Sequence, residues 1–278
     1  MYCLSGMLTS THITSLVSLL EEAGREIMRI YRNEDLKIKL KDDMSPVTIA
    51  DLASDSIIKA GLRSLTPDIP VFSEETKDVP YSERSLWKIL WILDPLDGTR
   101  EFISRNDEFC ISLALIKDRK PVAGFIHSPV TCETWVAEKG KGAYRLSGEE
   151  IIILPFTATT GPIRINISRM HHSQKEAEWI ENFKKENEIS IEIHGSAIKF
   201  CKIAEGISDL YPKFSLIYEW DIAAGQIIIE ESGGRIIETL TGKPPVYNKE
   251  DYRQPPFIAF GKSVKEWGEG TGLRQRKE

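Results

Sequence analysis

The sequence predicts an α+β first half and an α/β second half. In the first half, two stretches of apolar residues at helical spacing are followed by short apolar runs separated by turn residues. This pattern is typical of helices packed on a mixed or antiparallel sheet. In the second half, strand and helix patterns alternate, which favours an α/β unit. We therefore expect two domains, residues 1–158 and 159–278.

The elements of the first half follow from periodicity and turn residues. A long amphipathic helix is expected to begin near Ser10, because apolar residues recur at helical spacing from 13 to 30. A second helix is expected over residues 48–65. Strands are expected at 71–72, 87–93, 109–116, 122–126 and 134–137. The last three should form an antiparallel meander.

The second half is expected to alternate between strands and helices after the proline-flanked segment 155–162. Strands are predicted at 163–168, 189–193 and near 208–211, with helices beginning at Ser173, Ser196 and Trp220. The last residues, 271–278, are typical of a solvated tail.

Composition excludes several classes of protein. The net charge of −6 gives no support for a surface that binds nucleic acid or anionic membranes, which would need a basic patch. The 4 cysteines are widely spaced and form no Cys-x-x-Cys pair, so neither a zinc site nor a disulfide framework is indicated. No segment approaches the roughly 20 apolar residues of a spanning helix. We expect a cytoplasmic protein without membrane insertion.

Residues 91–102, WILDPLDGTREF, carry the strongest functional signal. An apolar strand leads to Pro95, which should end the strand ladder, so the chain is expected to turn where Asp94 and Asp97 begin. Gly98 lets backbone N–H groups approach an anion beside Thr99. Carboxylates and a carbonyl are ligands that a hard cation such as Mg²⁺ prefers. The alternative is an ordinary turn, since all these residue types are common in turns.

Three further acidic sites accompany this segment, and each has a simpler explanation. Glu74, followed by another glutamate at a predicted strand end, could be a solvated surface residue. Asp51 lies in the first turn of a predicted helix, where the helix dipole favours an acid without any other function. Asp221 lies at another helix start, where it could serve only as a cap. Of the three, Asp221 could equally be held rigidly there for a metal ion.

Taken together, these motifs resemble the lithium-sensitive, Mg²⁺-dependent phosphatase superfamily that includes inositol monophosphatase and fructose-1,6-bisphosphatase. Within it, the chain is most similar to 3'(2'),5'-bisphosphate nucleotidases of the CysQ type, and the resemblance covers nearly the whole chain. The motifs concerned are SPVT at 45–48, FSEE at 72–75, DPLDGTREF at 94–102, GSAIKFC at 195–201, AEG at 204–206, YP at 211–212 and WD at 220–221. The resemblance implies a layered αβαβα sandwich.

The resemblance also implies a ligand set for two to three Mg²⁺ ions. It assigns one ion to Glu74, Asp94 and the Leu96 carbonyl. A second ion is assigned to Asp94, Asp97 and Asp221, and a weaker third to Glu74 with waters. Two such ions roughly 4 Å apart could clamp a phosphate and lower the pKa of a bound water.

In the same way, the resemblance assigns the catalytic groups. Asp51 and Thr99, acting as a pair, would orient and help deprotonate the attacking water, with Glu74 as the third catalytic residue. The N–H groups of Gly98 and Thr99 would hold the phosphate oxygens.

Substrate contacts are expected mainly from the second half. The resemblance places them at Ser168, His171, Gly195, Ser196, Lys199 and Lys213, together with Glu74, Leu96, Asp97, Gly98, Thr99 and Asp221. Lys199 lies one helical turn after Ser196, so both can face one cleft and bind a 5'-phosphate. Alternatively, Lys199 is a solvated helix residue and His171 an ordinary loop histidine. Many relatives carry Arg in place of Lys213, so a bidentate phosphate contact is either lost or replaced by a point charge.

The expected function is Mg²⁺-dependent removal of the 3'-phosphate from adenosine 3',5'-bisphosphate, which leaves AMP, in the sulfur-assimilation context of the family. The sulfated nucleotide precursor would be a side substrate. The first alternative is an inositol-monophosphate or sugar-bisphosphate phosphatase with the same metal core. The second is a catalytically silent nucleotide or metal sensor. A monomer and a homodimer both remain open.

Overall fold

The computed structural model describes residues 8–33, 39–40, 46–76, 79–156, 161–170 and 173–264. The helices are α1 (Ser10–Tyr31), α2 (Ile49–Leu65), α3 (Tyr81–Arg84), α4 (Thr99–Ile103), α5 (Gln174–Lys184), α6 (Ile198–Glu205) and α7 (Glu219–Glu231), with a 3₁₀ turn η1 (Glu74–Thr76). The strands are β1 (Lys39–Leu40), β2 (Pro46–Val47), β3 (Val71–Ser73), β4 (Ile89–Asp97), β5 (Cys110–Lys117), β6 (Lys120–Ser128), β7 (Glu133–Glu138), β8 (Gly142–Ser147), β9 (Glu150–Ile153), β10 (Ile163–Ser168), β11 (Ile189–His194), β12 (Leu210–Lys213), β13 (Arg235–Glu238) and β14 (Phe257–Phe260).

Two large sheets organise the described part of the chain. The first has 7 strands in the order β3-β4-β5-β6-β7-β8-β9, with β3 parallel to β4 and the remaining neighbours antiparallel. The second has 5 strands in the order β11-β10-β12-β14-β13, with β10 parallel to both of its neighbours. The predicted antiparallel meander and the predicted βαβ alternation are both confirmed.

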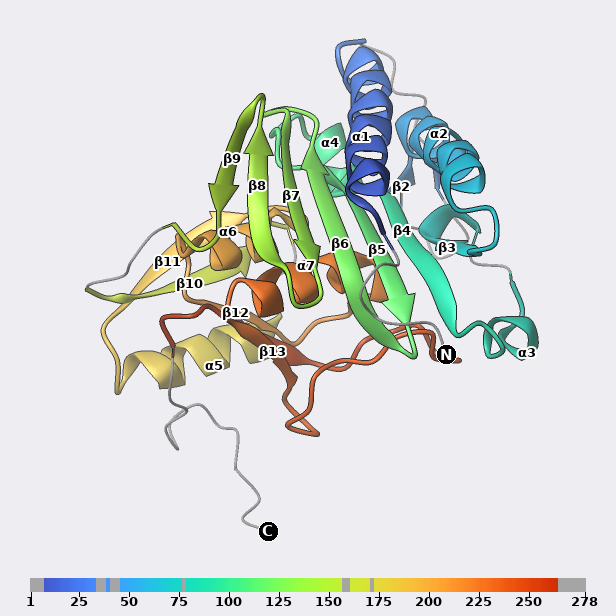
Figure 1. The fold of residues 1–278 in the computed structure, drawn as a ribbon. Helices are drawn as coiled ribbons and strands as arrows, with labels where there is room; N and C mark the ends of the chain where they lie inside the picture. Colours follow the sequence, from blue (N-terminus) through green and yellow to red (C-terminus); the bar gives the residue numbers. More distant parts are fainter. Residues whose placement is uncertain are drawn as a thin grey trace.

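The helices complete five layers around these sheets (Figure 1). Helices α1 and α2 pack on one face of the first sheet, α6 and α7 lie between the two sheets, and α5 covers the far face of the second sheet. Buried apolar clusters fill the space between successive layers, because each sheet face and each amphipathic helix must bury its apolar side. The predicted αβαβα sandwich is confirmed.

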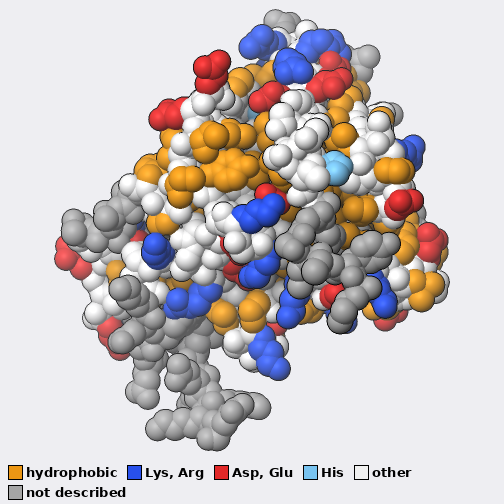
Figure 2. Space-filling model, viewed as in Figure 1, with side chains coloured by type: hydrophobic (Ala, Val, Ile, Leu, Met, Phe, Trp, Pro, Cys, Tyr) orange, Lys and Arg blue, Asp and Glu red, His pale blue; other side chains and the backbone are white. Residues whose placement is uncertain are grey.

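Helices α1 and α2 cover only part of the first sheet. On the same face, β7 to β9 carry half-buried Tyr144 and Leu146 and the exposed side chains of Ile151 and Ile153. Figure 2 shows apolar side chains gathered over this part of the molecule. None of the described helices is both long enough and apolar enough to pass through a bilayer.

Several element boundaries differ from the predicted ones. The strand expected at 87–93 is displaced to β4 (Ile89–Asp97), and the helix expected from Ser196 begins at Ile198. The sequence did not predict α3, α4, η1, β1, β2, β8, β9, β13 or β14. Short strands such as β8 and β9 have mixed burial, so they lack the apolar run or clean alternation that makes a strand recognisable.

The prediction that Pro95 ends the strand ladder was wrong. β4 continues to Asp97, which pairs with Cys110, and the register shifts between Asp94 and Asp97. A bulge tolerates proline because the bulged residues leave the regular ladder. The partner on the other side, β3, pairs with β4 only as far as Leu93. The acidic segment therefore lies on a bulge beside the end of a short strand.

The two predicted halves correspond to different sheets, but they are packed together closely. Residues 71–153 form the first large sheet and 163–260 the second, while part of the expected boundary lies outside the described residues. Helix α7, from the second half, packs on β5, β6 and β7 of the first sheet. The division into domains 1–158 and 159–278 stays a prediction.

The contact between α7 and β6 yields a stability prediction at Gly124. A Cβ at this position would lie 2.8 Å from the Ala224 carbonyl oxygen and 2.4 Å from Ile227 Cγ2. We expect Gly124→Ala to lower the free energy of unfolding by about 1–3 kcal/mol, because the backbone of α7 must move. Gly61→Ala is the matched control, since the three atoms nearest to its Cβ all belong to the Leu19 side chain, which can move more easily than a backbone, and alanine favours a helix. Urea denaturation of both variants measures the difference, and equal midpoints would contradict the prediction.

Candidate metal and phosphate site

A pocket of about 610 Å³ opens between the two large sheets. Its lining comes from η1, the turn between β4 and α4, the start of α6, the end of β12 and the start of α7. Most of the residues assigned from the sequence line it together: Glu74, Asp94, Leu96, Asp97, Gly98, Thr99, Ser168, Ser196, Lys199, Lys213 and Asp221. The fold thus unites segments that are distant in the sequence.

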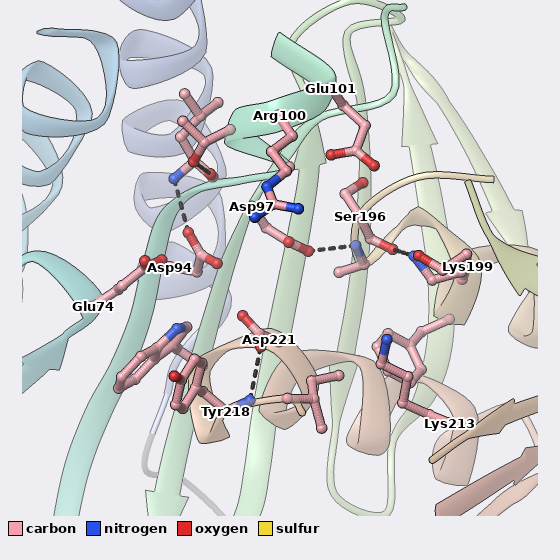
Figure 3. A pocket seen from close by; sticks show the side chains of 18 of the residues that line it. Glu74, Asp94, Asp97, Arg100, Glu101, Ser196, Lys199, Lys213, Tyr218 and Asp221 are labelled. Atoms are coloured by element: carbon pink, nitrogen blue, oxygen red, sulfur yellow. Dashed lines mark hydrogen bonds between the residues drawn. The ribbon is translucent and has the colours of Figure 1, made fainter. Parts of the chain in front are cut away.

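Three aspartates form the centre of this pocket. One carboxylate oxygen each from Asp94, Asp97 and Asp221 lies within 4.8 Å of the others. Figure 3 shows these carboxylates and that of Glu74 directed into the same space. Asp94 and Asp97 flank the bulge of β4, whereas Asp221 lies in the first turn of α7. The arrangement gives a set of oxygen ligands from three segments of the chain.

Backbone amides hold these carboxylates in place. Asp94 Oδ1 accepts a hydrogen bond of 3.0 Å from the Leu96 N–H. Asp221 Oδ2 accepts one of 2.8 Å from the Tyr218 N–H, which caps α7. Asp97 Oδ2 accepts a short hydrogen bond from the Ala197 N–H. The last bond joins the bulge of the first sheet to the loop before α6.

The clustered carboxylates destabilise one another in their charged forms. Burial raises the pKa of Asp94 well above its usual range, and neighbouring carboxylates raise it further. Burial and neighbouring carboxylates also raise the pKa of Asp221. Burial raises the pKa of Asp97 to about 7, although Lys199 opposes the shift. A divalent cation among these oxygens would offset the repulsion, so the residues fit a metal site.

A second group of hydrogen bonds joins Asp51 to Thr99. Asp51 is buried, and its Oδ2 accepts hydrogen bonds from the Thr48 N–H at 2.7 Å and the Thr48 hydroxyl at 2.6 Å. Its Oδ1 accepts the Thr99 hydroxyl at 3.0 Å. Burial raises the pKa of Asp51. The structure therefore brings the predicted pair together at the edge of the pocket.

Two glycines allow the loops around the pocket to approach closely. Gly98 has φ +94°, and a Cβ there would lie 3.2 Å from Ser196 Cβ. A Cβ on Gly195 would lie 2.7 Å from Glu101 Cγ, although Gly195 is not among the residues that line the pocket. Gly195 thus serves close packing of the loop before α6 against Glu101 of α4 and against Glu108.

The opposite side of the pocket carries two buried cations. Lys199 and Lys213 are only 5% and 4% exposed, so the alternative of a solvated Lys199 is wrong. Lys199 Nζ donates to the Ser196 carbonyl at 2.5 Å. Burial lowers the pKa of both lysines, opposed by nearby carboxylates. His171, the remaining predicted contact, lies outside the described residues.

The structure adds residues that the sequence did not single out. Arg100, Leu216 and Tyr218 line the pocket. The Ser54 hydroxyl donates to the Pro95 carbonyl at 2.7 Å and so fixes the bulge of β4 from α2. Arg100 directly follows the acidic motif, so its position in the sequence could have identified it as a pocket residue. Ser54 and Pro95 are 41 residues apart, and no sequence pattern indicated their contact.

The raised pKa of Asp97 predicts how metal ions change stability with pH. An unfolded aspartate has a pKa of about 3.9. Because the pKa of folded Asp97 is higher, the Asp97 side chain contributes to the stability of the metal-free fold in full below about pH 3.9. Its contribution is lost as the pH rises through about 7. We expect Mg²⁺, used as a probe, to raise the melting temperature more at pH 8 than at pH 6, since protons compete with metal. Thermal denaturation with chelator or with Mg²⁺ tests this, and an equal or larger gain at pH 6 would contradict it.

Comparisons with known proteins agree with the fold and with the site. The model of the inositol monophosphatase family matches residues 9–266. The 3'(2'),5'-bisphosphate nucleotidase CysQ of Aggregatibacter actinomycetemcomitans is 34% identical over 258 residues, covering 91% of this chain and 93% of that protein. The CysQ nucleotidase of Escherichia coli (strain K12) is 38% identical over 248 residues, 88% of this chain and 98% of that protein.

A solved structure gives the same result. The crystal structure of CysQ from Bacteroides thetaiotaomicron, a bacterial member of the inositol monophosphatase family, has a TM-score of 0.82 and 35% sequence identity. The matched region covers 92% of this chain and 99% of the chain in that crystal structure. The resemblance stated from the motifs is confirmed, and this chain belongs to the inositol monophosphatase family of metal-dependent phosphatases.

Proposed function

We propose that this protein is a Mg²⁺-dependent 3'(2'),5'-bisphosphate nucleotidase that converts adenosine 3',5'-bisphosphate to AMP and phosphate. The observation that carries the proposal is a single pocket with a carboxylate cluster on one side and two buried lysines on the other. A substrate with two separated phosphates matches these two sides. The names of the CysQ relatives support the same substrate class. The sulfated nucleotide precursor would be a side substrate.

The carboxylate side would hold Mg²⁺. Its donor set consists of carboxylates with the Leu96 carbonyl nearby and includes neither histidine nor cysteine ligands, which favours a hard cation. We assign two to three ions to Glu74, Asp94, Leu96, Asp97 and Asp221. When bound, Mg²⁺ would neutralise charge on the phosphate and make a water more acidic.

Asp51 and Thr99 would handle the proton of the attacking water. The Thr99 hydroxyl already donates to Asp51, so its oxygen lone pairs are free to accept a hydrogen bond from a water in the pocket. As that water attacks phosphorus, its proton would pass to Thr99 while the Thr99 proton moves to Asp51 Oδ1. The bond from phosphorus to the 3'-oxygen would break in the same step, and this oxygen would take a proton from solvent to become the 3'-hydroxyl of AMP. Burial raises the pKa of Asp51, which favours this transfer. Glu74, on the same side of the pocket, would help orient the water.

The remaining residues would bind the substrate. The N–H groups of Gly98 and Thr99, at the start of α4, would hold oxygens of the 3'-phosphate. Lys199 and Lys213 would bind the 5'-phosphate as point charges, with Ser196 and Ser168 beside them in the pocket. His171 remains a proposed contact. Such an enzyme would act in the cytoplasm as a monomer or a homodimer.

A substrate panel tests the proposed function. Phosphate release is measured with Mg²⁺ from adenosine 3',5'-bisphosphate, inositol 1-phosphate, fructose 1,6-bisphosphate and AMP. We expect strong preference for the nucleotide bisphosphate, with AMP untouched, because AMP lacks the phosphate that would reach the metal side. A preference for inositol 1-phosphate would keep the metal site and overturn the substrate. No phosphate release from any of the four compounds would favour a catalytically silent sensor, although all the acidic residues of the proposed site and Thr99 are present.

The Asp51–Thr99 pair is tested by changing Thr99. We expect Thr99→Ala to lower kcat by about 10²- to 10⁴-fold, because the hydroxyl that relays the proton is lost. Thr99→Ser keeps the hydroxyl and is the matched control, with kcat expected close to the original. The rise in melting temperature on adding Mg²⁺ should persist in both variants, since the Thr99 side chain is not a proposed metal ligand. A Thr99→Ala enzyme with unchanged kcat would remove this residue from the mechanism.

A further inference from the structure

One wall of the pocket is formed by the last residue of β12 and the short connection that follows it. The segment 213–218 connects the end of β12 to the start of α7, and Lys213, Leu216, Ile217 and Tyr218 line the pocket. Leu216 is 62% exposed, so this wall reaches the mouth of the pocket. We call residues 213–218 the substrate wall. Lys213 belongs to β12, where it pairs with Phe257 of β14, and the rest of the wall follows it directly.

A buried carboxylate on α5 holds this wall from behind. Glu176 is 5% exposed, and its Oε1 accepts hydrogen bonds from the Phe214 N–H at 2.9 Å and from Ser215. The Ser215 bonds come from its N–H at 3.3 Å and its hydroxyl at 3.1 Å. The Phe214 ring also packs against Trp179 of α5, with ring centroids 6.2 Å apart.

The bonds to Phe214 and Ser215 are not part of the helix cap. As the third residue of α5, Glu176 accepts the Ser173 N–H at 2.7 Å through Oε2, and its own N–H donates to Ser173 Oγ at 3.2 Å, which completes the capping box. Its other oxygen is committed to a segment 38 and 39 residues away in the sequence. Glu176 is itself not among the residues that line the pocket.

Charge also links Glu176 to the wall. Burial lowers the pKa of Lys213, and Glu176 acts most strongly among the carboxylates that oppose this shift. The pKa of Glu176 is itself lowered, because backbone hydrogen bonds from Ser173 and Phe214 outweigh the effect of its burial. A buried ammonium group is costly without a counter-charge. Glu176 supplies part of that charge, together with Asp221 and Asp97, from a position outside the lining of the pocket.

We infer that Glu176 is a positioning residue for substrate selection, which seats the substrate wall and balances the charge of Lys213. The inference rests on the proposed function, because it assigns the 5'-phosphate to the lysine side of the pocket. Loss of Glu176 should therefore weaken binding of a substrate with a 5'-phosphate and leave the metal side intact. A purely structural cap would affect all substrates alike.

The kinetic test compares two substrates that differ only in the 5'-phosphate. KM and kcat are measured for adenosine 3',5'-bisphosphate and adenosine 3'-monophosphate with Glu176→Ala. We expect KM for the bisphosphate to rise roughly tenfold or more, because hydrogen bonds to a charged group are lost. Changes in kcat and in KM for the monophosphate should stay within about threefold. Equal losses on both substrates, or none on either, would overturn the inference.

Three further variants define the cause. Glu178→Ala changes an exposed residue of α5 whose side chain pairs with Gln174, and should leave both KM values unchanged. Glu176→Gln keeps an acceptor for the wall but removes the charge, so an intermediate KM is expected. Ser215→Ala removes a single hydroxyl bond and tests the wall even where Glu176→Ala fails to fold. An unchanged KM in both Glu176→Gln and Ser215→Ala would overturn the inference.

Amide hydrogen exchange separates this inference from the proposed function. We expect faster exchange at Phe214 and Ser215 in Glu176→Ala but not in Glu178→Ala, because the acceptor of both amides is removed. If the wild-type enzyme has no preference for the bisphosphate, the proposed function fails, and the substrate-selecting role fails with it. If the preference holds while exchange or KM stays unchanged in Glu176→Ala, only the inference about Glu176 fails.

Discussion

Repulsion between clustered carboxylates is the constraint on which this site depends. Asp94, Asp97 and Asp221 bring oxygens within 4.8 Å of one another, and each has a raised pKa in the absence of a cation. Such a cluster opposes folding at neutral pH, so the rest of the structure must hold it together. The same repulsion is the source of its affinity for a divalent cation. Stability and function are therefore opposed at this point, and a bound divalent cation would relieve the opposition.

Hydrogen bonds within several helices and loops hold the acidic side chains in place against this repulsion. Asp51 and Asp221 occupy the same position in their helices, the third residue, and each uses one oxygen to cap the helix start. For Asp51, the other oxygen accepts the hydroxyl of Thr99. The alternatives of cap and functional acid, which the sequence left open, are thus compatible. A cap fixes the carboxylate, and a fixed carboxylate needs little reorganisation during reaction.

The local motifs could be predicted from the sequence, whereas contacts between distant segments could not. The acidic segment of β4 is recognisable because strand, proline, acids and glycine follow one another directly. The bulge at Pro95 was missed, because it depends on pairing with β5 and on the hydroxyl of Ser54, 41 residues away. The burial of Lys199 was equally hidden, since periodicity does not show that a second sheet covers that helix face. Sequence patterns report neighbours along the chain and not across layers.

The position of the pocket between two sheets links its two sides. The Ala197 N–H, before α6, donates to Asp97, so the loop that carries Ser196 is bonded directly to a proposed metal ligand. Lys199, one turn further on, lowers the pKa of that same aspartate. An anion bound at Lys199 would reduce the positive charge near Asp97, whereas a cation bound at Asp97 would reduce the negative charge near Lys199. Ligands of opposite charge would also attract each other across this short span, so metal and substrate should each strengthen binding of the other.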